Sequence, residues 1–104
     1  MRIKPGVILD GIQTPMLNVL VVVNAAYARQ GIEVWVTCGL DGEHMEGSLH
    51  DKGLALDFRT RKIRIKIIEA IAAEVKTKLG DAYDVMIEKD HLHVEHDPKQ
   101  KGNK

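Results

Sequence analysis

The clearest periodic pattern of apolar positions lies in the second half of the chain. Apolar side chains recur there every four residues, at Ile63, Ile67, Ile71 and Val75. This is the spacing of one face of an α-helix, and Gly80, shortly after the pattern, is typical of a helix end. The pattern therefore predicts a helix from Arg61 to Leu79 that packs one face against a core.

A second helix is predicted closer to the N-terminus. Thr14 and Pro15 form a start signal, because hydroxyl side chains cap helices and proline suits the first helical position, and Gly31 is a typical C-cap. The β-branched run from Val19 to Val23 favours a strand instead, but the cap signals bracket a segment of ordinary helix length. We therefore predict a helix over 14–30, largely buried because most of its surface is apolar.

The remaining apolar segments predict strands. Alternating or β-branched residues indicate them at 7–10, 32–37, 54–58, 84–88 and 91–96. A tight turn near Lys89 and Asp90 joins the last two, so we expect these to pair antiparallel. Trp35 and Phe58 are expected in the core. The fold class is therefore α+β, with two main helices packed on a small antiparallel sheet.

Composition and charge narrow the classes of function. The chain has 104 residues, 44% of them apolar, and a formal net charge of zero. We therefore expect one domain over 1–96 and no field that attracts nucleic acid or an anionic membrane. The polar, basic tail over 97–104 is expected to be mobile. Cys38 is the only cysteine, which excludes an internal disulfide. The basic run from Arg59 to Lys66 is interpreted as a solvated helix face rather than a polyanion-binding site.

Histidine and carboxylate side chains gather in two short segments. All five histidines lie within 44–50 or 91–96, beside acidic residues, and imidazole and carboxylate are common ligands of a catalytic zinc ion. His91, His93 and Glu95 alternate on a predicted strand, so they share one face. Taken alone, this face suits the solvated side of a half-buried strand equally well.

The first segment offers a matching pair of ligands. His50 and Asp57 are seven residues apart with Gly53 between them, and glycine permits the turn that would bring the two side chains together. Taken alone, Asp57 could instead cap the next helix or pair with a following arginine. Together with His93, the pair supplies three ligands and leaves a fourth position for water, which distinguishes catalytic from structural zinc.

A hydrolytic site of this kind also needs a general base beside the metal. Asp90 and Glu88 are the candidates. His91 is the candidate for stabilising the developing oxyanion or for moving a proton.

Two motifs carry a resemblance to a known group of enzymes. The residues from Ser48 to Asp57 resemble the SxHxxGxAxD signature of D-Ala-D-Ala-type zinc peptidases. The residues from His91 to His93 resemble the HxH motif of the wider LAS group, which also includes lysostaphin-type and hedgehog-like domains. The motifs occur in the family order, and the likeness spans roughly residues 34–95. It implies a hedgehog/DD-peptidase-like fold.

The resemblance also implies roles for individual residues. It implies zinc on His50, Asp57 and His93, which agrees with the ligands found above. Family members carry an acidic base three residues before the last ligand, here Asp90, whereas hedgehog-like members carry a glutamate further upstream, here nearest Glu88.

The function implied by the resemblance is that of a zinc-dependent peptidase. Its substrate would be a peptidoglycan stem peptide, cleaved in the manner of a D-Ala-D-Ala carboxypeptidase or an endolysin. We expect a monomer without nucleic-acid or membrane partners. The N-terminus does not resemble a signal peptide, so we expect cytoplasmic synthesis, with any action at the cell wall following export or phage lysis.

One segment departs from the peptidase pattern. Residues 36–41 lack the arginine with which related bacterial and phage peptidases bind substrate, and are closer to hedgehog signalling domains, known mainly as binding proteins. The alternative function is therefore a non-catalytic zinc-binding interaction module. His44 either lines the pocket in the arginine's place or is a solvated loop residue, and Ser48 is the second candidate for substrate binding.

Overall fold

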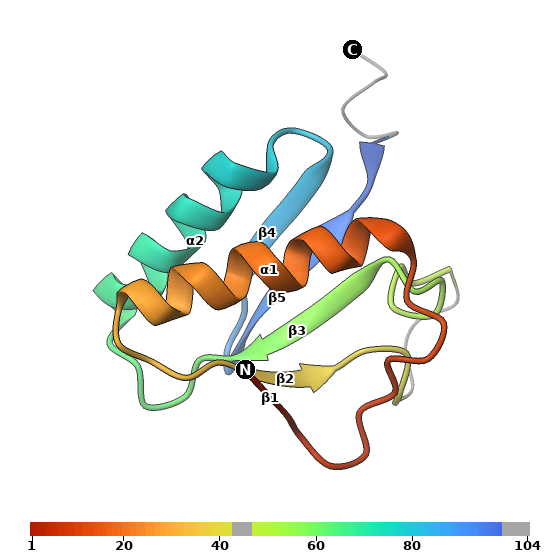
Figure 1. Ribbon diagram of the computed structural model, residues 1–104, viewed down its shortest axis with the longest axis horizontal. Helices are drawn as coiled ribbons and strands as arrows, with labels where there is room; N and C mark the ends of the chain where they lie inside the picture. Colours follow the sequence, from red (N-terminus) through yellow and green to blue (C-terminus); the bar gives the residue numbers. More distant parts are fainter. Residues whose placement is uncertain (43–46, 99–104) are drawn as a thin grey trace.

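The computed structural model describes residues 1–42 and 47–98. Within them, two helices and five strands form an α+β fold (Figure 1). In chain order the elements are β1 (Arg2–Ile3), α1 (Thr14–Arg29), β2 (Trp35–Cys38), β3 (Ala55–Arg59), α2 (Ile65–Leu79), β4 (Tyr83–Ile87) and β5 (His91–His96). No helix among these residues is long and apolar enough to cross a bilayer.

The sheet is mixed, with the strand order β1-β2-β3-β5-β4. The pairs β2–β3, β3–β5 and β4–β5 are antiparallel, as expected, but β1 runs parallel to β2. The prediction of a wholly antiparallel sheet is therefore wrong at this edge. The reason lies in the connection, because α1 separates β1 from β2 and a parallel pair needs such a crossover.

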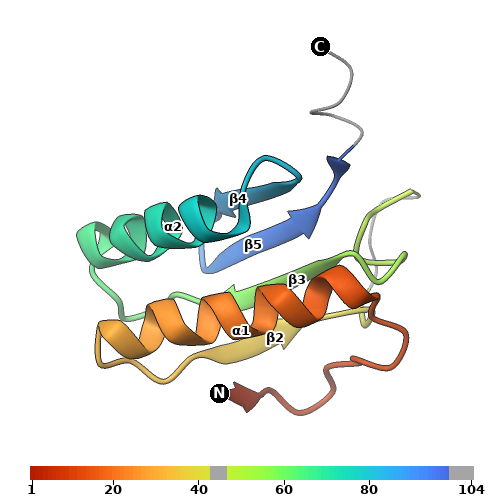
Figure 2. The same cartoon turned by 45° about the horizontal axis from the view of Figure 1, so that its top comes forward.

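Both helices cover the same face of the sheet, which leaves the other face without a helix (Figure 2). The helix-covered face is the core, and the alternation of a strand decides which residues reach it. Leu56 and Phe58 of β3 pair with Val94 and Leu92 of β5, and all four are fully buried. The residues between them point to the open face. That face therefore receives the polar side chains of β3 and β5.

The helices follow the predictions with differences at their starts. In α1, Thr14 is the first helical residue rather than the cap, and Gln13 at the cap position makes no side-chain capping bond. Leu17 and Val21 are 55% and 69% exposed, so the prediction of a largely buried helix is wrong for one side of α1. The second helix begins four residues later than predicted, since residues 61–64 form a turn before Ile65.

Two predictions in the first half of the chain are wrong. Residues 7–10 are not a strand. They lie instead along the loop after β2, where the Leu40 N–H donates to the Ile8 carbonyl oxygen at 2.8 Å. Trp35 is only half-buried, because it sits on the open face with the Arg59 guanidinium carbon 4.8 Å from its ring centre. Phe58 is buried, as predicted.

A backbone hydrogen bond fixes the residue that follows the last strand. The Asp97 N–H donates to the Ala82 carbonyl oxygen at 2.8 Å, which ties the residue after β5 to the turn before β4. The rest of the predicted tail, from residue 99 on, lies outside the described residues.

Candidate metal centre

Three donor atoms from distant parts of the chain converge on the open face of the sheet. His50 Nε2 lies 3.1 Å from Asp57 Oδ1 and 3.3 Å from His93 Nδ1, and the last two atoms are 2.9 Å apart. A tetrahedral zinc ion with bonds of about 2.0–2.2 Å separates its ligand atoms by about 3.3–3.6 Å. One metal ion can therefore bind all three atoms after small outward shifts.

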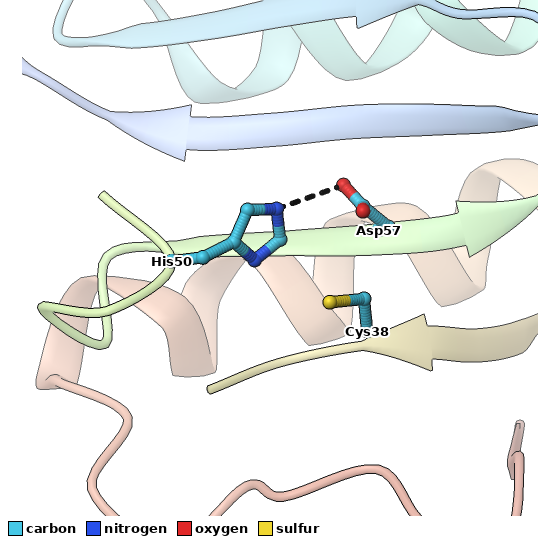
Figure 3. A group of neighbouring side chains, drawn as sticks. All are labelled: Cys38, His50 and Asp57. Atoms are coloured by element: carbon cyan, nitrogen blue, oxygen red, sulfur yellow. Dashed lines mark hydrogen bonds and ion pairs between the residues drawn. The ribbon is translucent and has the colours of Figure 1, made fainter. Parts of the chain in front are cut away.

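The sheet register and one loop bring these ligands together. Asp57 on β3 and His93 on β5 are direct cross-strand partners, so both side chains leave the same face at adjacent positions. His50 comes from the loop before β3 and points its ring towards Asp57 (Figure 3). The three residues predicted as ligands are therefore the three that the structure brings into contact.

The hydrogen bonds on the far side of each imidazole fix which nitrogen faces the cluster. His50 Nδ1 is 2.9 Å from the Gly39 carbonyl oxygen, which can only accept, so Nδ1 carries the proton and Nε2 the lone pair. His93 Nε2 donates in the same way to Glu95 Oε1 at 2.7 Å, which leaves the lone pair on Nδ1. With both rings neutral, two lone pairs and a carboxylate oxygen face one another without a proton between them, so the cluster calls for a cation. Without a metal ion that cation is a further proton, and the ring that takes it up donates a hydrogen bond to Asp57.

The electrostatics of the cluster agree with this reading. Burial pushes the pKa of Asp57 upwards, but hydrogen bonds with His50 and His93 outweigh it and hold that pKa well below its ordinary value. Burial lowers the pKa of His93, yet hydrogen bonds with Asp57 and Glu95 raise it above the ordinary value overall. Both shifts show that the site favours positive charge beside a buried carboxylate.

Glu95 holds one metal ligand in position without being one itself. Its carboxylate accepts from the outer nitrogen of His93, the arrangement that orients metal-binding histidines in many proteins. We expect Glu95→Gln to weaken metal binding about 10- to 100-fold while leaving one metal per chain at saturation. Titration with a competing chelator measures this, with the exposed Glu69→Gln as the control. Equal affinities in the two variants would show that Glu95 has no such role.

Cys38 is a fourth donor close to the cluster. Its sulfur and the donor atoms of His50 and Asp57 all lie within 4.8 Å of one another, and it projects from β2 towards the same space (Figure 3). Burial, followed by the charges of Asp41 and Asp57, raises the pKa of the thiol to about 12. The thiol therefore keeps its proton at neutral pH unless a bound metal displaces it. No motif in the sequence marks Cys38 as a ligand.

Two glycines let the chain close around His50. The Gly53 N–H donates to the His50 carbonyl oxygen at 3.0 Å, and its own carbonyl accepts from Gln13 at 2.8 Å. A Cβ at Gly53 would lie 2.2 Å from the Gly11 carbonyl oxygen, and one at Gly39 would lie 2.3 Å from that of Ile8. Gly53 also has a φ of +74°. Both positions thus need glycine, because the N-terminal segment packs directly against the backbone that carries and orients His50.

A substitution at Gly53 tests this packing. We expect Gly53→Ala to lower the free energy of unfolding by about 3 kcal/mol or more, since it adds a backbone clash to the cost of a positive φ. Gly31→Ala is the matched control, with a φ of +72° and open space around the added carbon. It should cost only about 1–2 kcal/mol. Urea unfolding measures both, and equal losses would contradict the close approach.

Two of the three predicted catalytic residues, His91 and Asp90, lie beside the cluster. Asp90 Oδ1 accepts from His91 Nδ1 at 2.7 Å, and this hydrogen bond holds the pKa of Asp90 below its ordinary value. His91 Nε2 lies 3.7 Å from Asp57 Oδ2. The turn before β5 therefore aims Asp90 at His91 rather than at the metal ligands. Glu88 is exposed. Its backbone N–H donates to the His91 carbonyl oxygen at 2.8 Å, which closes the turn between β4 and β5.

Ser48 and His44 are the two residues predicted to bind substrate. The Ser48 hydroxyl oxygen accepts from the His50 N–H at 3.1 Å, so it supports the loop that carries a metal ligand. His44 lies outside the described residues. His96 points away from the cluster and packs edge-on against Tyr83, with ring centres 4.8 Å apart.

Two hollows adjoin the open face. One, of about 310 Å3, has Asp57, alone of the three candidate ligands, in its wall together with His91 and Asp90. The other, of about 510 Å3, lies beside β4 and includes Glu95 but none of the three ligands. The smaller hollow holds a candidate ligand and two candidate catalytic residues, and we call it the ligand cleft.

No protein-family model, curated protein or solved structure that was compared with the chain matches it. The geometry of the site and the two motifs therefore carry the functional argument.

Proposed function

We propose that the chain is a zinc-dependent peptidase that hydrolyses peptide bonds in peptidoglycan stem peptides. The observation that carries the proposal is the convergence of His50 Nε2, Asp57 Oδ1 and His93 Nδ1, within 2.9–3.3 Å of one another, beside an open cleft. Three nitrogen and oxygen donors with access from solvent are typical of catalytic zinc. The choice of zinc and of the peptidoglycan substrate rests on the likeness of the two motifs to D-Ala-D-Ala-type peptidases.

Zinc held by these residues would polarise the substrate carbonyl and acidify a water molecule. The protein's own task is to hold and move protons next to that carbonyl. Because the ionised Asp90 accepts from Nδ1 of His91, the neutral ring keeps its lone pair on Nε2, the nitrogen that faces the cluster. His91 can thus take a proton from the attacking water and, once charged, stabilise the oxyanion or donate to the leaving amine.

In this scheme Asp90 and His91 act as one unit. The carboxylate sets the tautomer of the ring and stabilises its charged form, as in other carboxylate–histidine pairs. Glu88 has no place in the unit, since its side chain does not line the ligand cleft.

The test is digestion of purified peptidoglycan by the zinc-loaded chain, followed by mass spectrometry of the muropeptides. We expect shortened stem peptides or separated cross-links that are absent after chelation and return when zinc is restored. Intact muropeptides from a protein that carries one zinc per chain would overturn the peptidase proposal.

The second candidate is the non-catalytic zinc-binding module, and Cys38 is the observation that favours it. If the thiolate joined His50, Asp57 and His93, four protein ligands would close the site, as in structural zinc centres. Cobalt substitution separates the two candidates. A sulfur-to-cobalt charge-transfer band that disappears in Cys38→Ser supports the closed module, whereas its absence in the parent supports the open, catalytic site.

A further inference from the structure

The ligand cleft has three cations in its wall. Lys4, Arg59 and Arg61 line it together with Asp57, Asp90 and His91. The sequence had placed both arginines in a basic run interpreted as a solvated helix face. The structure divides that run, because Arg59 and Arg61 line the cleft, whereas Lys62 and the later basic residues do not.

These three cations have no counter-charge of their own. None of the ion pairs among the described residues involves Lys4, Arg59 or Arg61. The two carboxylates in the same cleft are already engaged, Asp57 with the ligand histidines and Asp90 with His91. The wall is thus prepared for an anion from outside the protein.

Arg59 is held in place rather than free to turn into solvent. Its guanidinium lies over the half-buried Trp35 ring, 4.8 Å from the ring centre, and the Tyr27 hydroxyl donates to its carbonyl oxygen at 2.9 Å. Arg61 follows two residues later at the exposed rim of the same cleft. A planar guanidinium suits the two oxygens of a carboxylate better than a lysine does.

We propose that this wall binds the free α-carboxylate of the substrate peptide, with Arg61 and Arg59 as its binding residues, and that the protein removes the C-terminal residue. The inference rests on the proposed function and selects the carboxypeptidase mode over the endopeptidase mode. Arg59, Arg61 and one metal ligand, Asp57, line the same cleft. A C-terminal carboxylate held by the arginines would therefore put the last peptide bond beside the metal, with the C-terminal residue as the leaving group. Water adds to the carbonyl carbon, the C–N bond breaks, the nitrogen takes a proton, and one free amino acid leaves.

The test compares two synthetic stem peptides that differ only at the C-terminus, one a free acid and one an amide. We expect the zinc-loaded parent to hydrolyse the acid in strong preference to the amide. Arg61→Gln should raise KM for the acid roughly 10- to 100-fold, the range of a lost hydrogen bond to a charged group, and so remove most of the preference. Arg64→Gln is the matched control, an exposed arginine outside the cleft, and should retain the parent's preference.

Two results would overturn the proposal. One is a parent that hydrolyses acid and amide equally well, and the other is an Arg64→Gln variant that loses the preference as Arg61→Gln does. Failure of the peptidase proposal is distinguishable, since it appears as no hydrolysis of either peptide. In that case, calorimetry with the zinc-loaded protein tests the carboxylate subsite directly. If the parent binds the acid more tightly than the amide and Arg61→Gln loses this difference, the subsite is supported. Equal binding of acid and amide by the parent rejects it.

Discussion

Asp57→Asn is expected to abolish stoichiometric metal binding while leaving the fold intact. The carboxylate is the only anionic ligand among the three and is 8% exposed. Loss of a residue that merely orients a ligand costs about 10- to 100-fold in affinity, so loss of the ligand itself should cost at least about 100-fold. Metal analysis after dialysis measures the effect, and Asp51→Asn, an exposed neighbour in the same loop, is the control.

The fold of this variant should survive for a specific reason. The amide group has the shape of the carboxylate, and its N–H groups can donate to the lone pairs of His50 Nε2 and His93 Nδ1. In the variant, the amide group thus gives both ring nitrogens a hydrogen-bond donor, whereas in the parent the bound metal occupies their lone pairs. Its melting temperature should match or exceed that of the metal-free parent.

Thermal unfolding with and without zinc completes this test. At a zinc concentration of about 100 times the Kd, binding should raise the melting temperature of the parent by roughly 10–20 °C. Asp57→Asn should show no such rise. A variant that binds one zinc and gains the same thermal stability would contradict the assignment of Asp57 as a ligand.

The ligand set could be predicted from sequence because it depends on local rules. Period-two alternation puts His93 on the face opposite Leu92 and Val94, and Asp57 opposite Leu56 and Phe58. Once both strands bury their aliphatic residues, their polar residues must meet on the other face. The glycine at position 53, which permits the turn after His50, adds the third ligand.

The remaining parts of the site depend on contacts that no local rule determines. The register of β2 shifts between Val36 and Cys38, and this irregularity accompanies the approach of the sulfur to the ligands. Lys4 reaches the cleft because β1 pairs with β2 in parallel, and the sequence indicated no strand at Arg2–Ile3. The prediction for Trp35 failed for a different reason: Val34 and Val36 on either side of it are buried, so the alternation of the strand puts Trp35 on the open face.

Asp90→Asn is expected to lower kcat by about 100- to 10,000-fold with little change in metal content, the range for loss of one acid–base group. The amide oxygen can still accept from His91 Nδ1, so the ring stays in place. The negative charge that stabilises the protonated ring is lost, however, and the ring then takes up a proton less readily. Steady-state kinetics on a stem peptide, with zinc content measured on the same sample, checks both parts of the expectation.

Glu88→Gln decides between the two acidic candidates. Its side chain lies outside the ligand cleft, whereas Asp90 lines it, so Glu88→Gln should retain nearly the parental kcat. The opposite result, a slow Glu88→Gln and an active Asp90→Asn, would assign the acid–base role to Glu88 instead of the Asp90–His91 pair and require the turn before β5 to rearrange on substrate binding. Activity in both variants together with its loss in His91→Ala would leave His91 as the base without help from either carboxylate.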